Sequence, residues 1–510
     1  MPQHTKPQHT NPIIAAMFDS QQFAETGHQL IDLLATHLAE NLAGASKVLN
    51  WKMPVLEDAN WQAPLPQTPT IDPQGLLQKI QEEILPYNLA IHHPHNMGHQ
   101  VATPLPMAAL CDLVAALTNQ AMAVYETGPS ATMLERQVIR WLCALIDNGS
   151  AWQNAGGVLT SGGAQANLTA LLVARQISTK RANPSSNIWQ NGVTAESKLR
   201  ILVSEHAHYS ISRAAGVMGL GSDSVIKIAA DQAGKMDLKA LQNAHQACLS
   251  KHETVIAVVA NAGCTPTGSI DPLMAIGEYC QSHQLWLHVD GAHGASALLS
   301  KTHAHKISGI ALADSVVWDG HKLMYMPAAV SAVLFRNEQH SYAAFSQDAS
   351  YLFQGNSPQE EAFNLSYRTL ECTKRMMALK LWAGFSLYGS DGMGALIDEG
   401  FAKATILASK IQARADIELL MPPETNIVCF RYRPQHLNQA QINQHQSHIR
   451  QHIVQHGEFH LTQVDLHGST WLRTTLMNPF TTAQDLDALL DALALASAAI
   501  ASQAASSMAE

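Results

Sequence analysis

Short apolar runs alternate with longer amphipathic segments through the middle of the chain. Short runs bounded by polar or glycine residues are typical of buried strands, and apolar residues every three to four positions are typical of helices. Alternation of the two predicts an α/β fold with a mostly parallel sheet. The expected strands lie at residues 158–159, 200–204, 225–229, from 254, 286–289, 315–318 and 328–336.

The two ends of the chain follow different patterns. Residues 19–45 have helical periodicity, residues 46–72 predict an extended linker, and residues 73–90 are helical again. This first part shows no obvious core of its own, so we expect it to pack on another subunit or on the main domain. From about residue 395 the pattern changes to a smaller α+β domain. The expected domains are 1–100, 101–390 and 391–510, with helices at 367–388 and 394–414 around the second boundary.

Composition narrows the class of protein. The chain has 510 residues, of which 46% are apolar and only 14% charged, as in a well-buried globular protein. The net charge of −10 and the absence of a basic stripe make nucleic acid an unexpected partner. Seven cysteines without a CxxC motif indicate reduced thiols in the cytoplasm. We expect no membrane span and no signal peptide, because no apolar run is long enough.

Four histidines lie close together before the first strand, at His92, His93, His95 and His99. A metal site is one reading of such a cluster. However, their spacing places them on no common helical face, and the neighbouring prolines favour a loop. We therefore expect a loop that lines a polar pocket, and no bound metal.

Asp290 closes one expected strand, and Lys322 follows the next, 32 residues later. Parallel α/β sheets bind ligands at the carboxyl ends of their strands, so the two side chains could meet in one pocket. A buried lysine can form a Schiff base with an aldehyde such as pyridoxal phosphate, whose ring nitrogen needs a carboxylate to stay protonated. The alternative is that Asp290 caps a turn and Lys322 is an ordinary surface lysine.

A glycine-rich turn leads from the first expected strand into a helix, in the sequence Thr160-Ser-Gly-Gly. The free N–H groups and positive dipole at a helix N-terminus form a phosphate cradle. Many turns of this kind bind nothing, so the signal is weak alone. Loops after other strands carry His208, Asn261 and Thr265, which could complete one pocket.

Between residues 75 and 495 the chain resembles the group II pyridoxal-phosphate-dependent amino acid decarboxylases. The resemblance rests on the motifs HPHNMGHQ, TSGGAQANLTALLVAR, SEHAHYSISRAA, NAGCTPTGSID, HVDGAHGA, DSVVWDGHK, YLFQ followed by LECTKR, and WLRTTLMNP. It implies the fold-type-I architecture, with a seven-stranded sheet, helices on both faces and a smaller C-terminal domain. It also implies a homodimer with the active site at the subunit interface.

The resemblance assigns a role to each residue of the pocket. It implies that Lys322 is the Schiff-base lysine, that Asp290 pairs with the pyridinium nitrogen, and that Ala292 and His208 lie on the two faces of the ring. The family often has Asn where this chain has Asp319, and a carboxylate there would repel the phosphate. The other implied cofactor contacts are Gly162, Gly163, Ala164, Asn261, Asp319 and His321.

One departure bears on the reaction. The family's mobile loop usually carries a tyrosine that reprotonates Cα, and the matching position here is Phe363. Tyr367 lies four residues on and could compensate, or the gap between the motifs is placed a few residues wrongly. If neither residue serves, the carbanion could be protonated by His208 or water, or could react with oxygen to give an aldehyde.

The resemblance implies two substrate contacts, Arg473 for a carboxylate and His99 near the substrate. They favour a carboxy-lyase that converts an acidic amino acid, such as glutamate, aspartate or cysteine sulfinate, or 2,4-diaminobutyrate, to the amine and CO2. Aromatic substrates stay open. The alternatives are a decarboxylating oxidase, an aminotransferase-like enzyme of the same fold, and a non-enzymatic scaffold.

Overall fold

The computed structural model describes residues 11–194, 197–345, 361–434 and 437–507. The chain divides into two compact units. The larger comprises residues 98–446 and 462–479, and the smaller comprises residues 1–97, 447–461 and 480–510. The domain boundaries expected from the sequence stay a prediction.

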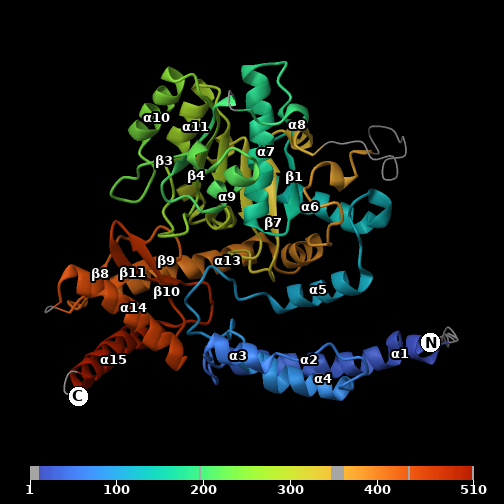
Figure 1. The fold of residues 1–510 in the computed structure, drawn as a ribbon, viewed down its shortest axis with the longest axis vertical. Helices are drawn as coiled ribbons and strands as arrows, with labels where there is room; N and C mark the ends of the chain where they lie inside the picture. The colour runs from blue at the N-terminus through green and yellow to red at the C-terminus, as the bar shows by residue number, and fades with distance from the viewer. Residues whose placement is uncertain (1–10, 195–196, 346–360, 435–436, 508–510) are drawn as a thin grey trace. The chain divides into compact units, whose positions relative to one another are not determined.

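The larger unit is built on a seven-stranded sheet with the order β1-β7-β6-β5-β4-β2-β3 (Figure 1). β7 is antiparallel to both of its neighbours, whereas the pairs from β6 through to β3 are parallel. The prediction of a mostly parallel sheet is confirmed. The strands are β1 (Gly156–Thr160), β2 (Leu199–Ser204), β3 (Val225–Ile228), β4 (Thr254–Asn261), β5 (Leu287–Asp290), β6 (Ser315–Asp319) and β7 (Ser331–Phe335).

Successive residues of the strands alternate between two hydrophobic cores. Val258 of β4 packs in one core and Val259 in the other, and both side chains are fully buried. Because the sheet is covered on both faces, its strands are continuously apolar rather than alternating with polar residues. Burial of each such side chain contributes about 1.5–3 kcal/mol, so the sheet is a rigid platform for the residues at its strand ends.

Helices cover both faces of this sheet (Figure 1). α7 and α9 belong to one core, and α6, α10 and α11 to the other. The helices of the larger unit are α5 (Pro106–Thr118), α6 (Pro129–Ile146), α7 (Gly163–Ala182), α8 (Ile188–Asn191), α9 (Ser210–Val217), α10 (Leu238–Ser250), α11 (Leu273–Ser282) and α13 (Ala378–Gln412).

The two helices expected on either side of residue 390 are both present, as two helical stretches that meet at a break and share the label α13. α13 begins at Ala378 and continues through a kink at Gly389, whose φ is 67°. The prediction that the first helix begins at residue 367 is wrong. Residues 368–377 are irregular, because Arg368 and Lys374 turn inward and bind Glu338 and Glu135.

A second, four-stranded antiparallel sheet in the larger unit has the order β10-β11-β9-β8. Its two central strands, β9 and β11, coincide with apolar runs in the sequence. The outer strands, β8 and β10, carry polar residues and are short, which is why the hydrophobic pattern did not reveal them. The strands are β8 (Ile417–Leu419), β9 (Ile427–Tyr432), β10 (Thr462–Leu466) and β11 (Ser469–Thr475).

The smaller unit is largely helical. The expected linker contains a short helix, α3, and the histidine-rich segment is an irregular loop, as expected. His95 in this loop stacks on Phe459 and is hydrogen bonded to Asp485 at 2.9 Å. No helix within the described ranges could cross a membrane. The helices of the smaller unit are α1 (Pro12–Met17), α2 (Ser20–Leu42), α3 (Pro54–Asn60), α4 (Pro73–Lys79) and α15 (Ala483–Ser507). α14 (Gln439–His456) belongs to the smaller unit from residue 447.

Candidate active site

A polar cavity opens at the carboxyl ends of β4, β5 and β6, beside the N-terminus of α7. Asn261, Asp290 and Asp319 are the last residues of those three strands, and Lys322 follows three residues after β6. The parallel register sets Asn261 directly beside Asp290. The cavity, together with the open solvent at its mouth, measures about 680 Å³. It is lined by Gly163, Ala164, Asn167, His208, Asn261, Gly263, Cys264, Thr265, Asp290, Ala292, His293, Asp319, His321 and Lys322.

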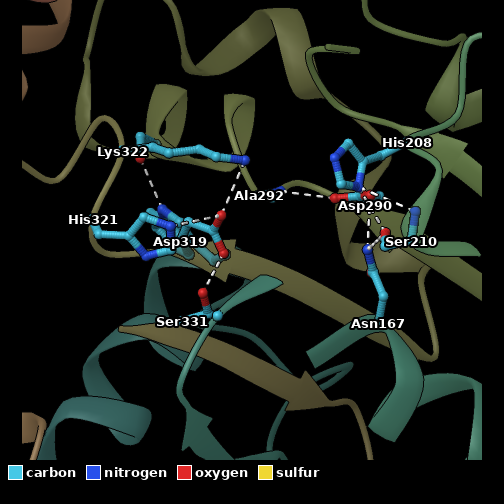
Figure 2. Close-up of polar contacts among 12 residues, drawn as sticks. Asn167, His208, Ser210, Asp290, Ala292, Asp319, His321, Lys322 and Ser331 are labelled. Carbon is cyan, nitrogen blue, oxygen red and sulfur yellow. Dashed lines mark hydrogen bonds and ion pairs between the residues drawn. The ribbon is translucent and has the colours of Figure 1, made fainter. Parts of the chain in front are cut away.

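Lys322 and Asp319 form an ion pair on one side of the cavity (Figure 2). Lys322 Nζ lies 3.0 Å from Asp319 Oδ2, and His321 Nε2 lies 3.6 Å from the same oxygen. Ser331 donates a hydrogen bond to the other carboxylate oxygen of Asp319. The carboxylate is therefore held rigidly next to the amine.

Asp290 is held on the other side of the cavity by two N–H donors (Figure 2). Asn167 Nδ2 donates to Asp290 Oδ2 at 3.0 Å, and the Ala292 amide donates to Oδ1 at 3.2 Å. Both donors stabilise the charged form of a carboxylate that is only 7% exposed. Asn167 also contacts Ser210, which is hydrogen bonded to His208.

The N-terminus of α7 forms a further wall of the cavity. Gly162 precedes the helix with a φ of 152°, a backbone conformation that residues other than glycine rarely adopt. A Cβ added to Gly163 would lie 2.9 Å from Asp319 Oδ1, so the backbone is open to the cavity only because the side chain is absent. The first N–H groups of the helix and its positive dipole end suit an anion.

Asn261 reaches the cavity from the end of β4, where its backbone is tightly held. Its backbone N–H donates to Asp271 Oδ2 at 2.7 Å, and Met236 N–H donates to Oδ1 of the same carboxylate at 2.7 Å. Burial raises the pKa of Asp271 to about 6. The buried amide nitrogen Nδ2 of Asn261 has no hydrogen-bond partner among the described residues. A buried donor without a partner costs free energy, which a polar ligand would recover.

Burial also favours the neutral form of His208, His288 and His293. It lowers the pKa of His208 below its ordinary value, against the opposing charge of Asp290. It lowers the pKa of His288, beneath the cavity, to about 4 and that of His293 to about 3. These imidazoles therefore act as hydrogen-bonding groups rather than as cations near neutral pH.

Four residues predicted to act in catalysis or substrate binding are not among the described residues that line the cavity. His99 is exposed. Phe363 lies under the Arg136 guanidinium at 4.8 Å and 5.9 Å from the Tyr125 ring. Tyr367 ends the 3-10 helix η10 (Leu365–Tyr367), and Arg473 lies on β11. The loop positions 351, 353, 355 and 358 lie outside the described residues.

Arg473 is nevertheless a neighbour of the site. The residue is 5% exposed, its Nε donates to the Pro266 carbonyl at 3.1 Å, and its charge helps to lower the pKa of His293. Its Nη2 has no partner among the described residues. A buried guanidinium nitrogen in this state is suited to a carboxylate.

Asn167, Cys264 and His293 line the cavity although sequence reasoning did not single them out. Asn167 lies one helical turn after Gly163, so the same face of α7 carries both, and this spacing could have revealed it. His293 follows Asp290 by three residues in the motif HVDGAH. Its Nε2 is hydrogen bonded to Asn426 Oδ1 at 2.7 Å. No pattern in the sequence indicates that contact.

The arrangement supplies three kinds of chemistry in one cavity. Lys322 offers an amine that can attack an aldehyde, Asp290 a fixed carboxylate that can hold a protonated ring nitrogen, and the start of α7 a site for an anion. A ligand with an aldehyde, a basic ring nitrogen and a phosphate would match all three.

Comparison with known proteins decides the family. Residues 60–433 match the model described as the pyridoxal-dependent decarboxylase conserved domain, which is more than half of the chain. The chain belongs to the pyridoxal-dependent decarboxylase family. This confirms the resemblance seen in the sequence. The protein is thus a carboxy-lyase of the amino acid decarboxylase type, and its cofactor is pyridoxal phosphate.

The decarboxylase has relatives with different substrates in their names. It is 30% identical to an L-2,4-diaminobutyrate decarboxylase of Acinetobacter baumannii, over 82% of each chain. It is 32% identical to a cysteine sulfinic acid decarboxylase of Rattus norvegicus, over 80% of this chain and 83% of that one. A solved glutamate decarboxylase domain from Vibrio parahaemolyticus superposes with a TM-score of 0.83 at 26% identity, over 96% of this chain and 97% of that one.

Proposed function

We propose that this enzyme removes the α-carboxylate of an L-amino acid with an acidic side chain, or of 2,4-diaminobutyrate, and releases the amine and CO2. The observation that carries the proposal is the cavity that joins Lys322, Asp290 and the N-terminus of α7. Bound pyridoxal phosphate supplies an electron sink for the negative charge left on Cα when CO2 departs.

Each wall of the cavity has a task in this proposal. Lys322 Nζ would hold the aldehyde carbon, and Asp290 would keep the ring nitrogen protonated. His208 and Ala292 would bound the two faces of the ring and fix its plane, because geometry selects which bond to Cα breaks. Gly162, Gly163, Ala164 and His321 would hold the phosphate. Asn261 Nδ2 would donate a hydrogen bond to the phenolic oxygen attached to the ring.

The substrate class rests on Arg473 and on the relatives. The unpaired Nη2 of Arg473 supports recognition of a carboxylate. The names of the two relatives above support cysteine sulfinate and 2,4-diaminobutyrate as the first substrates to test. His99 is kept as a proposed substrate contact.

A second outcome is carried by Phe363. This side chain has no proton to deliver, and it packs against Arg136 and Tyr125. If neither Tyr367 nor another group delivers a proton, the negative charge on Cα would persist and react with oxygen. The products would then be an aldehyde, ammonia and hydrogen peroxide, with oxygen as the oxidant and water supplying the aldehyde oxygen.

The proposal includes a homodimer in the cytoplasm. α5 exposes a row of apolar side chains to which a second copy could bind, and its members are Met107, Leu110, Leu113, Val114 and Leu117. All seven cysteines lie among the described residues and are free thiols, in keeping with a reducing compartment.

The test is a panel of L-amino acids assayed for CO2 and amine with the purified holoenzyme. Borohydride reduction followed by peptide mapping should place the cofactor on Lys322, and Lys322→Ala should release no CO2. Lys380→Ala is the matched control. Like Lys322, Lys380 forms an ion pair with an aspartate, but it does not line the cavity. Absence of CO2 with every amino acid would contradict the proposal.

A further inference from the structure

Asn167 donates hydrogen bonds both to Asp290 and to Ser210, and Ser210 in turn contacts His208 (Figure 2). Asn167 is 2% exposed and lies in the first turns of α7. Its Nδ2 donates to Asp290 Oδ2 at 3.0 Å and to Ser210 Oγ at 3.0 Å. Its Oδ1 is paired with His288 Nε2 at 2.9 Å. All three polar positions of the amide are thus used.

The chemistry of the neighbours fixes which way the amide points. A carboxylate only accepts hydrogen bonds, so the Asn167 atom that faces Asp290 must be the NH2 group. Oδ1 then faces His288, whose Nε2 must carry a proton in order to donate. His288 is buried in the sheet and neutral, so its Nδ1 accepts from Ser315 Oγ at 2.9 Å. Ser315 itself accepts from Trp286 Nε1 at 2.9 Å. The chain of donors therefore runs from the sheet to Asp290.

The second hydrogen of the Asn167 amide orders the contact with His208. Ser210 Oγ accepts that hydrogen, and its own hydroxyl proton points to His208 Nδ1 at 2.9 Å. The Ser210 backbone N–H also approaches His208 Nδ1, at 3.3 Å. A nitrogen that accepts from two donors carries no proton, so neutral His208 is protonated on Nε2.

We propose that Asn167 is a positioning residue that aligns the Asp290 carboxylate with the ring nitrogen of the cofactor and, through Ser210, keeps His208 protonated on Nε2. The inference rests on the proposed function, since it assigns Asp290 and His208 to the cofactor ring. It goes beyond that function because one buried amide sets both the orientation of the Asp290 carboxylate and the tautomer of His208. Asn167 acts through these neighbours and need not touch the substrate.

Three variants separate the two parts of the proposal, which are the alignment of Asp290 (the Asp290 branch) and the tautomer of His208 (the His208 branch). Asn167→Leu keeps the branched outline of the side chain and removes every hydrogen bond of the amide. Asn167→Asp keeps the shape but sets an acceptor against Asp290. Ser210→Ala removes the hydroxyl that links Asn167 to His208 but leaves the hydrogen bond from Asn167 to Asp290 in place. Ser178→Ala is the control, because Ser178 is buried on the same helix and donates to the Ile256 carbonyl, away from the cavity.

The first readout is the ¹⁵N resonance of ring-labelled pyridoxal phosphate bound to the protein. A carboxylate that loses a donor becomes more basic and takes the proton from the ring nitrogen. We expect a protonated nitrogen in the wild type, Ser178→Ala and Ser210→Ala, and a shift toward the neutral position in Asn167→Leu and Asn167→Asp. The affinity for the cofactor should fall roughly 10- to 100-fold in these two variants, as for loss of a hydrogen bond to a charged group.

The second readout is the pair of ring ¹⁵N resonances of His208 in histidine-labelled protein, assigned by their loss in His208→Gln. We expect one tautomer, protonated on Nε2, in the wild type and Ser178→Ala. A mixture of tautomers is expected in Ser210→Ala and in both Asn167 variants.

The results distinguish this inference from the proposed function. If the wild type binds no pyridoxal phosphate, the proposed function fails. If it binds the cofactor but Asn167→Leu and Asn167→Asp leave both the ring-nitrogen resonance and the affinity unchanged, the inference is overturned. Should Asn167→Leu not fold, Asn167→Asp decides the Asp290 branch and Ser210→Ala the His208 branch. An unchanged His208 tautomer in Ser210→Ala would overturn the second branch.

Discussion

Lys322 Nζ lies 3.0 Å from Asp319 Oδ2, and the same carboxylate faces Gly163 at the start of α7. Asp319 is fully buried and accepts a hydrogen bond from Ser331. A fixed negative charge thus lies between the proposed Schiff-base lysine and the proposed phosphate position. It orients the amine and at the same time repels a phosphate.

Asp319→Asn should therefore bind pyridoxal phosphate more tightly. Removal of a like charge from a partly screened site should make the binding free energy of pyridoxal phosphate more favourable by about 1–2 kcal/mol, which lowers the Kd roughly tenfold. Pyridoxal, which lacks the phosphate, is the control ligand, and its Kd should change much less. Weaker binding of pyridoxal phosphate by Asp319→Asn would show that the carboxylate does not face the phosphate. Both constants can be measured by fluorescence titration of the apoenzyme.

Arg473→Met should raise the KM for the preferred acidic substrate by roughly 10- to 100-fold, because a hydrogen-bonded charge pair is lost. The matched control is Arg431→Met on the neighbouring strand β9, where the guanidinium pairs with Glu418 instead. Steady-state kinetics on both variants provide the measurement. An unchanged KM in Arg473→Met would remove Arg473 from substrate recognition.

Lys374→Met should destabilise the fold by about 3–5 kcal/mol, because it leaves the buried Glu135 carboxylate without its cation. Both side chains of this ion pair are 1% exposed, and Glu135 also accepts from the Leu159 backbone N–H at 2.9 Å. Urea unfolding measures the loss. The double variant Lys374→Met with Glu135→Leu should recover most of it, and failure to recover would mean that Lys374 acts in another way.

The same ion pair shows why part of the fold was predictable and part was not. The strands were predicted because each is a continuous apolar run buried on both faces. The first turns of the expected helix at 367 were mispredicted because Arg368 and Lys374 bind partners about 30 and 239 residues away in the sequence. Such long-range contacts override local helical propensity.

The candidate site divides in the same way. Asp290 and Lys322 were predictable because strand ends and residue chemistry are visible in the sequence. The spacing of Asn167 from Gly163 could have placed it in the cavity, but its hydrogen bond to Asp290 forms only in the folded chain. His293 was not predictable, because no pattern in the sequence indicates its hydrogen bond to Asn426. The roles given to Phe363, Tyr367 and His99 stay predictions.

Asp271→Asn should make the stability of the protein depend more steeply on pH. The pKa of Asp271 is raised to about 6 from 3.8, so its contribution is fully present below pH 3.8 and is lost as pH rises through about 6. The pKa of His288 is lowered to about 4 from 6.5, so its contribution is fully present above pH 6.5 and is lost as pH falls toward 4. The two groups oppose each other between pH 4 and 6.

Removal of the Asp271 carboxyl leaves the histidine effect unopposed. The slope of unfolding free energy against pH should increase by about 1.4 kcal/mol per pH unit in this window. Urea unfolding of wild type and Asp271→Asn at several pH values measures both slopes. Equal slopes would mean that Asp271 titrates near its ordinary value.

The most direct measurement of the central claim is a mass balance on the holoenzyme with its best amino acid substrate. CO2, amine, aldehyde, peroxide and oxygen consumption are measured together, in air and without oxygen, for the wild type and Lys322→Ala. The account predicts equal amounts of CO2 and amine, with or without oxygen, and no product from Lys322→Ala. Aldehyde and peroxide formed only in air, or CO2 released by Lys322→Ala, would contradict it.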